Sequence, residues 1–301
     1  DSYKANPVWN NAFKTITSGA CDFTYGSSTS NAFSSPYRIT VLSNTPFTED
    51  GVEYAGTAMY VNYPGMGNMT KFMASSRELN QFYGADKRYK MVGIGDHCFE
   101  GATNMIDPGI DKMTFLETIG DYAFNGLSSM TEIKIPAQVS YIGENAFAGC
   151  SKLTKVYSAI ADPTGRVINN DAFPSNSGMT LYVPKTCKST DLFKNMVAFS
   201  KFATITQSEV AYDYKSGAMY LVCTKNPVST NYGEIALTGI DATKLTDGAF
   251  SRSNSLIAFG PYKFYLTAVA QKACYGNTGI KSVNFTGCTQ LATLQSSAFS
   301  G

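Results

Sequence analysis

A nine-residue string recurs along the chain, and this repeat limits the fold more than any other feature of the sequence. It reads IGDHCFEGA from Ile94, IGDYAFNGL from Ile119 and IGENAFAGC from Ile142. With its phenylalanine as the reference, the motif recurs at Phe99, Phe124, Phe147, Phe173, Phe250, Cys274 and Phe299. The successive intervals are 25, 23, 26, 77, 24 and 25 residues. A period in the twenties is typical of a solenoid, in which each repeat forms one turn.

The residues around the phenylalanine repeat as well. A branched aliphatic residue stands five positions earlier in every copy: Ile94, Ile119, Ile142, Ile168, Leu245, Val269 and Leu294. A small residue stands directly before it, namely Cys98, Ala123, Ala146, Ala172, Ala249, Ala273 and Ala298. Turns that stack at about 4.8 Å place equivalent residues directly above one another. Each of these positions is therefore predicted to form a continuous apolar column inside the solenoid.

Between the copies, the chain alternates like a half-buried strand. Met130, Ile133 and Ile135 point one way, whereas Glu132 and Lys134 point the other way. The segments SKLTKVY, MTLYVP and IKSVNF occupy the equivalent place in other turns. We expect these segments to form one ribbon of parallel strands along the solenoid.

The segment IPAQVSYIGENAFAGCSKL resembles the leucine-rich repeat of the BspA-like surface proteins of anaerobic bacteria, and VNFTGCTQLATLQSSAFSG resembles it less closely. The resemblance covers about residues 91–184 and 240–301. It implies a mostly β repeat solenoid with short helical or irregular turns, built from leucine-rich-repeat arrays of about 23–26 residues per turn. Asn169 in place of Gly, Cys274 in place of Phe, and the proline after Phe173 depart from the motif and predict irregular turns.

The repeat divides the chain into three predicted parts. Residues 1–90 lack the motif and are expected to form a β-rich N-terminal capping unit. Residues 91–206 are expected to form the first array with its C-terminal cap, and residues 207–301 a second array that ends inside a motif copy and so looks truncated at its C-terminus.

Four local predictions accompany this division. The segment MTLYVPKTCKSTDLFKNMVAFSKFATITQ resembles the strand, short helix and closing strand that often end an array in this family, and Asp191 to Phe202 within it has a helix-compatible pattern. The segment AYDYKSGAMYLVCTKNP predicts a hairpin with its turn at Lys215 to Gly217. In the N-terminal unit, AMYVNYPG is predicted to be a strand, and TKFMASSRELNQFYG a short helix ended by Gly84.

Composition narrows the classes of function. The net charge is +1 with a pI near 7.6, and no block of lysine or arginine suits a nucleic acid. No apolar run reaches the 18 or so residues that a membrane span needs, so no membrane insertion is expected within this chain. The cysteines of the motif are predicted to be reduced core residues, because Cys98 and Cys150 lie two turns, on the order of 10 Å, apart.

The sequence also argues against catalysis. Its one histidine, His97, lies inside a repeat, and no G-x-S-x-G motif accompanies it. Asp96, Asp121 and Glu144 occupy the same repeat position, which indicates turn chemistry or solvent exposure instead of a catalytic pair. The glycine-rich segment GMGNMTKF lacks the ending of a P-loop and is predicted to be a plain turn. We expect no enzyme activity, cofactor or metal.

The resemblance implies a secreted or cell-surface module for binding or adhesion, although no anchor is visible in this chain. Its partners would be a host matrix protein, another cell-surface protein or a glycan. The candidate contact residues project from the predicted ribbon: Glu132, Lys134, Lys155, Tyr157 and Tyr182. Such residues are also ordinary on an exposed sheet. Two other functions remain open: a structural spacer, and, least favoured, a glycan or peptide hydrolase with its site in residues 1–90.

Overall fold

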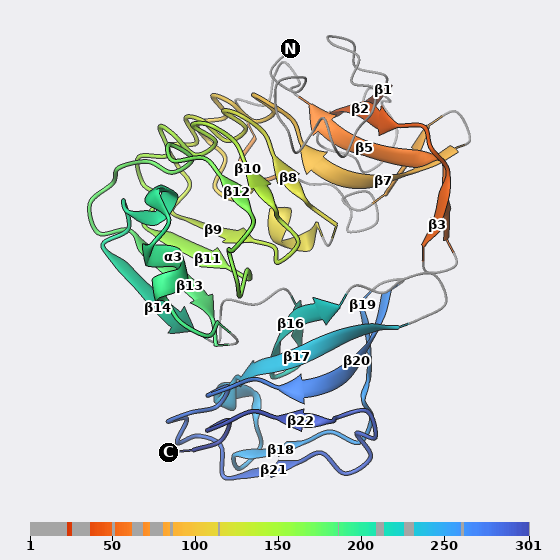
Figure 1. The fold of residues 1–301 in the computed structure, drawn as a ribbon, viewed down its shortest axis with the longest axis vertical. Coiled ribbons are helices and arrows are strands. Elements are labelled where there is room, and N and C mark those ends of the chain that lie inside the picture. Colours follow the sequence, from red (N-terminus) through yellow and green to blue (C-terminus); the bar gives the residue numbers. More distant parts are fainter. Residues whose placement is uncertain are drawn as a thin grey trace.

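The computed structural model describes residues 23–25, 37–49, 52–61, 69–72, 81–84, 87–113, 115–185, 187–208, 214–225, 232–259 and 262–300. Figure 1 shows a first coil of stacked turns, an N-terminal sheet beside it, and a second array near the C-terminus. The helices of the described residues are short, and none is long and apolar enough to cross a membrane. The mostly β solenoid that the repeat predicts is confirmed.

The turns of the first array build two parallel sheets that enclose the apolar columns (Figure 1). The aliphatic column forms a ladder of short parallel strands: β7 (Lys87–Ile94), β8 (Thr118–Ile119), β10 (Tyr141–Ile142) and β12 (Val167–Ile168). β8, β10 and β12 have only two residues each, and strand alternation cannot identify strands this short. The second sheet has the order β14-β13-β11-β9 and comprises β9 (Glu132–Ile135), β11 (Lys155–Ser158), β13 (Thr180–Pro184) and β14 (Thr204–Ser208). The alternation predicted for its strands is confirmed, since Ile133 and Ile135 are buried and Glu132 is exposed.

The phenylalanines of the first array stack into a spine. Phe99, Phe124, Phe147 and Phe173 are buried, and the ring centroids of neighbours lie 5.2–5.3 Å apart. This interval is close to the strand spacing of about 4.8 Å, so one register serves both the rings and the backbone. The predicted column is confirmed in this array.

Regular turns contain a left-handed residue on each side of the phenylalanine. In the turn of Phe124, Tyr122 has φ 55° and Gly126 has φ 80°. Such angles strain a residue that carries a Cβ, and glycine adopts them freely. The equivalent residues near Phe173, Asp171 and Ser175, are not left-handed. This difference confirms the irregular turn predicted there. The irregular turn predicted at Cys274 is wrong, because Lys272 and Gly276 are left-handed as in the regular turns.

One ribbon of strands does not run through both arrays, and that expectation is wrong. β21 (Ser282–Asn284) comes from the IKSVNF segment and pairs in parallel with β18 (Ala249–Ser251), in a sheet of their own. β14 and the cap end the first ribbon before the second array begins. Parallel pairing needs adjacent turns, and the cap interrupts the stack.

The cap contains two short helical turns instead of one helix. α3 (Asp191–Lys194) is followed by the 3₁₀ turn η3 (Val197–Phe199). The predicted order of strand, short helix and closing strand is confirmed by β13, α3 and β14, but the helix does not continue to Phe202, and Val197 is 62% exposed. The aromatic residues decide the packing, because Phe202 meets Phe173 edge-on with centroids 5.2 Å apart and so closes the spine.

The N-terminal sheet continues directly into the first array. β7 pairs in parallel with β5 (Gly56–Val61), which pairs with β2 (Tyr37–Ser43), and β2 pairs with β1 (Phe23–Tyr25). β6 (Gln81–Gly84) lies antiparallel to β7, and β3 (Phe47–Glu49) forms a hairpin with β4 (Val52–Tyr54). The predicted strand is confirmed over residues 58–61, whereas the predicted helix is wrong over residues 81–84; residues 62–65 and 73–80 lie outside the described residues. The glycine-rich GMGN segment also lies outside them.

The second array begins with strands arranged as in the N-terminal sheet. β15 (Tyr214–Ser216) and β16 (Met219–Lys225) form the predicted hairpin, with Gly217 at its turn, and β16 pairs with β17 (Gly233–Ile240). β17 pairs in parallel with β20 (Tyr262–Val269), and β20 with β22 (Thr293–Leu294). β19 (Leu256–Phe259) is antiparallel to β20, and a 3₁₀ turn, η4 (Ala242–Lys244), follows β17. The strands β1, β2, β5, β6, β7 and β8 thus match β15, β16, β17, β19, β20 and β22 in pairing and direction.

The two strand sets share an irregularity. The β5–β7 register skips Val92 between the pairs made by Ala58 and Met59. The β17–β20 register skips Thr267 between the pairs made by Ile235 and Ala236, at the same point of the ladder. Each array is thus preceded by a copy of the same set of strands, here called the starting unit. The second starting unit begins between Phe173 and Phe250, and it accounts for much of the 77-residue interval between these two motif copies.

This correspondence reveals a member of the spine that the motif does not show. Phe72 lies 27 residues before Phe99, much as Phe250 lies 24 residues before Cys274. It is buried and meets the Phe99 ring edge-on at 5.0 Å. Lys71 stands in the small-residue position before it, so the sequence pattern hides this copy.

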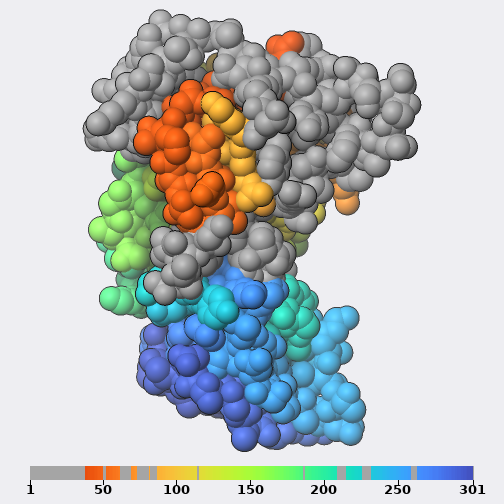
Figure 2. Space-filling view, turned by 90° about the vertical axis from the view of Figure 1, so that its right-hand side faces the viewer, coloured from red at the N-terminus to blue at the C-terminus, as the bar shows by residue number. Residues whose placement is uncertain are grey.

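The two arrays contact each other. Lys185 Nζ, at the end of β13, donates to the carbonyl oxygen of Ala273 at 3.0 Å. One apolar cluster of the second array also contains Met59, Val92 and Phe115, which come from the N-terminal sheet and the first array. Figure 2 shows the second array (blue) in the lower part of the molecule, below the strands of residues 37–61 (orange).

Candidate functional site

The repeated carboxylates of the motif hold adjacent turns together. Asp96 Oδ1 accepts the backbone N–H of Asp121 at 2.7 Å, and Asp121 Oδ1 accepts the N–H of Glu144 at 2.8 Å. A Cβ on Gly143 would collide with Asp121 Oδ1. The residue before Glu144 therefore has to be glycine, because the carboxylate of the previous turn needs this space to accept the Glu144 N–H. The interpretation of Asp96 and Asp121 as turn residues is confirmed.

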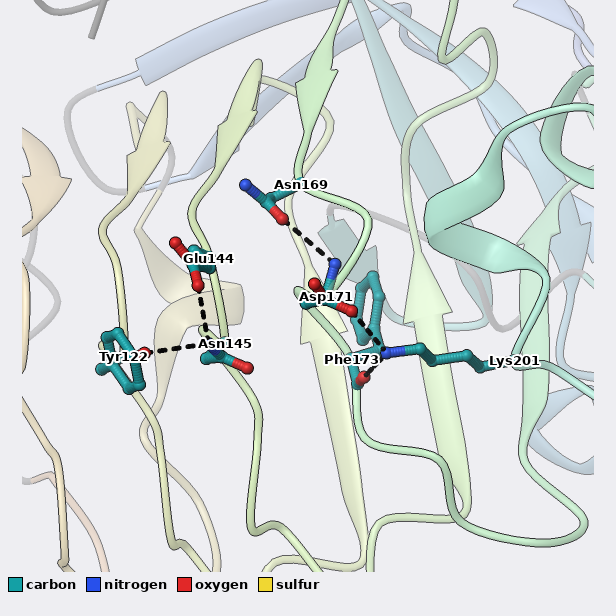
Figure 3. A network of polar contacts seen from close by, with 7 residues as sticks. All are labelled: Tyr122, Glu144, Asn145, Asn169, Asp171, Phe173 and Lys201. Atoms are coloured by element: carbon teal, nitrogen blue, oxygen red, sulfur yellow. Dashed lines mark hydrogen bonds and ion pairs between the residues drawn. The ribbon is translucent and has the colours of Figure 1, made fainter. Parts of the chain in front are cut away.

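A polar ladder runs along the left-handed positions of the turns. His97 stacks on Tyr122, with ring centroids 5.0 Å apart and planes 4° from parallel. Asn145 Nδ2 donates to the Tyr122 hydroxyl at 3.0 Å and to Glu144 Oε1 at 3.2 Å (Figure 3). These side chains bond mainly to their own neighbours, so the ladder joins turns.

The ladder ends on the cap. Lys201 Nζ donates to the Phe173 carbonyl oxygen at 3.2 Å and lies 3.3 Å from Asp171 Oδ1 (Figure 3). Asn169, which replaces the glycine of the motif, accepts the N–H of Asp171 with its own side chain at 3.1 Å. The cap therefore fastens itself to the irregular last turn by backbone and side-chain contacts.

His97 lies in a turn with its side chain 51% exposed, as expected for a loop histidine. Its Nδ1 lies 2.6 Å from Glu100 Oε2, and Asn125 Nδ2 donates to Glu100 Oε1 at 2.8 Å. The Asn125 hydrogen bond and the nearby His97 lower the pKa of Glu100. Within the described ranges, no three His, Cys, Asp or Glu side chains are grouped to hold a metal ion.

The outward side of the β9-β11-β13-β14 sheet, here called the ribbon face, gathers the predicted contact residues. Pairing places Lys155 opposite Glu132, Tyr157 opposite Lys134, and Tyr182 opposite Tyr157. The structure therefore brings all five candidate residues onto one surface. None of them is fully buried.

Two tyrosines form the centre of the ribbon face. The rings of Tyr157 and Tyr182 stack with centroids 4.8 Å apart and planes 17° from parallel. Partial burial, the Glu132 carboxylate and the neighbouring Tyr182 raise the pKa of Tyr157. Its hydroxyl therefore remains a hydrogen-bond donor at neutral pH.

Three threonines complete the ribbon face, and they were not among the contact residues predicted from the sequence. Thr204 lies opposite Thr180, and Thr206 lies opposite Tyr182. They extend the surface onto β13 and β14 with hydroxyl groups. Thr204 and Thr206 lie two residues apart on β14, and this spacing is a sequence signal for an outward face. The sequence prediction for this segment, a cap, does not include such a face.

A recess of about 180 Å³ adjoins the β9 edge of the ribbon face. It is lined by Glu132 and Lys134 and by residues around the 3₁₀ turn η2 (Ile110–Lys112). Burial and the carboxylate of Asp107 raise the pKa of Asp111, and Lys112 and Lys134 act against this rise. The charges at this edge thus largely compensate one another.

Two other hollows have none of the ribbon-face residues in their lining. The larger, about 860 Å³, lies beside the β3–β4 hairpin and the start of β7, where Phe47 stacks on Tyr54 at 5.1 Å. The smaller, about 340 Å³, separates first-array residues such as Arg166 from Cys223 and Lys225 on β16. Neither contains residues predicted to bind a ligand.

Comparison with known protein families finds a match over part of the chain. Residues 88–212 match the BspA type leucine rich repeat region in six copies. No curated protein matches the chain at a significant level.

Two solved structures are similar over most of the chain. One is a leucine rich cell surface protein from Faecalibacterium prausnitzii A2-165, with 17% identity over 95% of this chain and 87% of that chain, and a TM-score of 0.32. The other is a leucine-rich repeat protein from Bacteroides ovatus ATCC 8483, with 13% identity over 85% of this chain and 91% of that chain, and a TM-score of 0.19. Because these TM-scores are low, the fold assignment rests on the repeat region and on the strand pairing.

Proposed function

Because residues 88–212 are a BspA-type leucine-rich repeat region, we propose that this chain is a surface-displayed or secreted binding module that uses the ribbon face as its contact surface. Its partner would be a host matrix protein, another cell-surface protein or a glycan. The resemblance of the repeat to BspA-like surface proteins supports the location.

The observation that carries this proposal is the registered Tyr157–Tyr182 stack on an open sheet of four parallel strands. Tyrosine supplies a large, rigid contact area with a polar tip and is enriched at the centres of interfaces. The side chains of the polar ladder join adjacent turns by their own hydrogen bonds. Around Tyr157 and Tyr182, by contrast, the backbones of neighbouring strands already pair with each other. The tyrosines are therefore not needed to join the turns.

A binding experiment with matched variants tests the proposal. The full chain would be applied to panels of matrix proteins and glycans, beside a Tyr157→Ser/Tyr182→Ser double variant. We expect the double variant to lose about tenfold or more in affinity, because two aromatic anchors are removed. Tyr275→Ser provides a control, since Tyr275 is 54% exposed and belongs to the second array.

Thermal unfolding would show that both variants remain folded. Equal binding by the double variant and the parent would move the contact surface away from the ribbon face. If the folded parent bound no matrix protein, cell-surface protein or glycan, the structural spacer would become the better function. The hydrolase alternative concerns residues 1–90, much of which lies outside the described residues.

A further inference from the structure

We infer that the ligand of the ribbon face is an uncharged glycan chain that runs along the solenoid axis, with one sugar unit on each strand. The inference rests on the proposed function, since it names the chemical class of ligand for the same surface. Three properties of the face carry it: its charge, its spacing and its hydrogen-bonding groups.

The charge of the ribbon face falls to zero along the axis. Glu132, Lys134 and Lys155 lie on β9 and β11, where opposite charges are close together. The outward positions of β13 and β14 are Thr180, Tyr182, Thr204 and Thr206 and carry no charge. An acidic glycan or polypeptide would find no cation at these outward positions, whereas a neutral polyhydroxyl chain matches them.

The spacing of the face suits a glycan better than a peptide. Neighbouring strands lie about 4.7–4.9 Å apart, and the tyrosine rings repeat at 4.8 Å. This distance is close to the length that one pyranose adds to an extended β-linked glycan. Alternate sugars of such a chain are turned over, so the same side of the chain recurs on every second strand. An extended peptide presents same-side residues about every 6.6–6.8 Å, which matches neither one strand spacing nor two.

The hydrogen-bonding groups lie in two columns along the axis. One column contains Tyr157, Tyr182 and Thr206, and the other contains Thr180 and Thr204. Hydroxyl groups both donate and accept, so each can pair with a sugar hydroxyl in either sense. The stacked tyrosines face each other and turn their edges outward. We therefore expect hydrogen bonds to the tyrosine hydroxyls to contribute more than stacking on a ring face.

Oligosaccharides of increasing length test the register. Calorimetry on the full chain would use cello-oligosaccharides and N-acetylchito-oligosaccharides, from disaccharide to hexasaccharide. We expect affinity for at least one series to rise up to the tetrasaccharide, because the sheet has four strands, and then to level off. Affinity that is equal at every length would overturn the axial arrangement.

Hydroxyl deletions test the contacts. Tyr157→Phe/Tyr182→Phe keeps both rings and removes only their hydroxyls, and Thr206→Val removes the next one in the column. The double variant should lose about tenfold or more in affinity, because it deletes two hydrogen bonds to the ligand. A fivefold rise in salt should change binding less than about twofold, since a neutral ligand forms no ion pair that salt could screen.

The outcomes separate this inference from the proposed function. Tighter, salt-sensitive binding of heparin or polyglutamate would overturn the neutral ligand but keep the ribbon face. Binding of a matrix protein that Tyr157→Ser/Tyr182→Ser abolishes, with no oligosaccharide bound, would also keep the proposed function and reject the glycan. Oligosaccharide binding unaffected by all ribbon variants would reject both the glycan register and this contact surface.

Discussion

At the scale of single residues, the phenylalanine column shows that the position of a residue in the stack decides how far its side chain is buried. Phe124 is fully buried between Phe99 and Phe147, whereas Phe299 is 37% exposed in the last described turn. The two residues are identical in the motif. Phe124 has a stacked ring on each side, whereas the Phe299 ring lies 6.3 Å from the tilted ring of Phe285.

Phe124→Ala is expected to lower the free energy of unfolding by about 3–5 kcal/mol, because it removes a buried ring and leaves a cavity with packed walls. Phe299→Ala is the matched control and should cost clearly less, since its ring keeps more of its contact with water. Chemical denaturation of the two variants measures both values. Equal costs would contradict the stacked spine as the source of stability.

A single carboxylate gives the second array a predicted acid sensitivity. Hydrogen bonds from Thr243, together with the Lys215 ammonium 3.0 Å away, hold the pKa of Asp241 at about 2. An unfolded aspartate has a pKa of about 3.9. Because the folded pKa is lower, this contribution to stability is present above the unfolded pKa and is lost as pH falls from about 4 to 2.

Asp241→Asn should flatten that part of the pH profile, because asparagine keeps an acceptor for Thr243 and cannot titrate. Denaturation midpoints of the parent and the variant, measured at several pH values between neutrality and pH 2, check this expectation. The midpoints should converge toward low pH. Parallel profiles would show that Asp241 is not the group responsible.

At the scale of elements, the hydrogen bond that joins successive turns depends on a glycine in contact with each accepting carboxylate. A Cβ on Gly143 would collide with Asp121 Oδ1 and would lie 2.6 Å from the Asp121 backbone nitrogen. Backbone atoms cannot move away without opening the ladder between β8 and β10. The recurrence of the I-G-D/E string along this chain thus has a steric cause.

Gly143→Ala should therefore destabilise the first array by about 1–3 kcal/mol, as overpacking does in a close-packed interior. Gly178→Ala supplies a comparison. Gly178 has φ 76°, and a Cβ added there would meet no atom of the described residues within 4 Å. Only backbone strain of about 1 kcal/mol is therefore expected from this variant. Thermal unfolding and amide exchange at Glu144 measure the effect. Unchanged protection of the Glu144 amide would contradict the carboxylate cap.

At the scale of the whole molecule, two copies of one starting unit lead two arrays that dock on each other. The contact includes the hydrogen bond from Lys185 to Ala273 and an apolar cluster drawn from both arrays. Association of two such units through buried apolar surface opposes independent motion. The ribbon face and the second array therefore belong to one assembled molecule.

Lys185→Ala is expected to loosen this docking without unfolding either array. Amide exchange in β20 and around Ala273 should become faster, because the carbonyl of Ala273 loses its donor. Lys188→Ala is the control, since Lys188 is exposed and close in sequence. Equal exchange in both variants would show that the lysine contributes nothing to the interface.

The repeating parts of this protein could be predicted from its amino-acid sequence. A residue that recurs every 23–26 positions, such as Ile119 or Phe147, has to stack on its own equivalents, so its burial follows from the pattern alone. The outward positions of β9, β11 and β13 followed for the same reason, because strand alternation fixes them once the inward positions are known. The five candidate contact residues were found in this way.

The contacts between and beside the repeats became visible only in three dimensions. The burial of Phe72 in the spine, the matching bulges at Val92 and Thr267, and the outward threonines of β14 all depend on partners far away in the sequence. Local patterns carry no information about such partners. Contacts between non-repeating segments are selected by the packing of the whole chain, whereas contacts between repeats are already specified by the period.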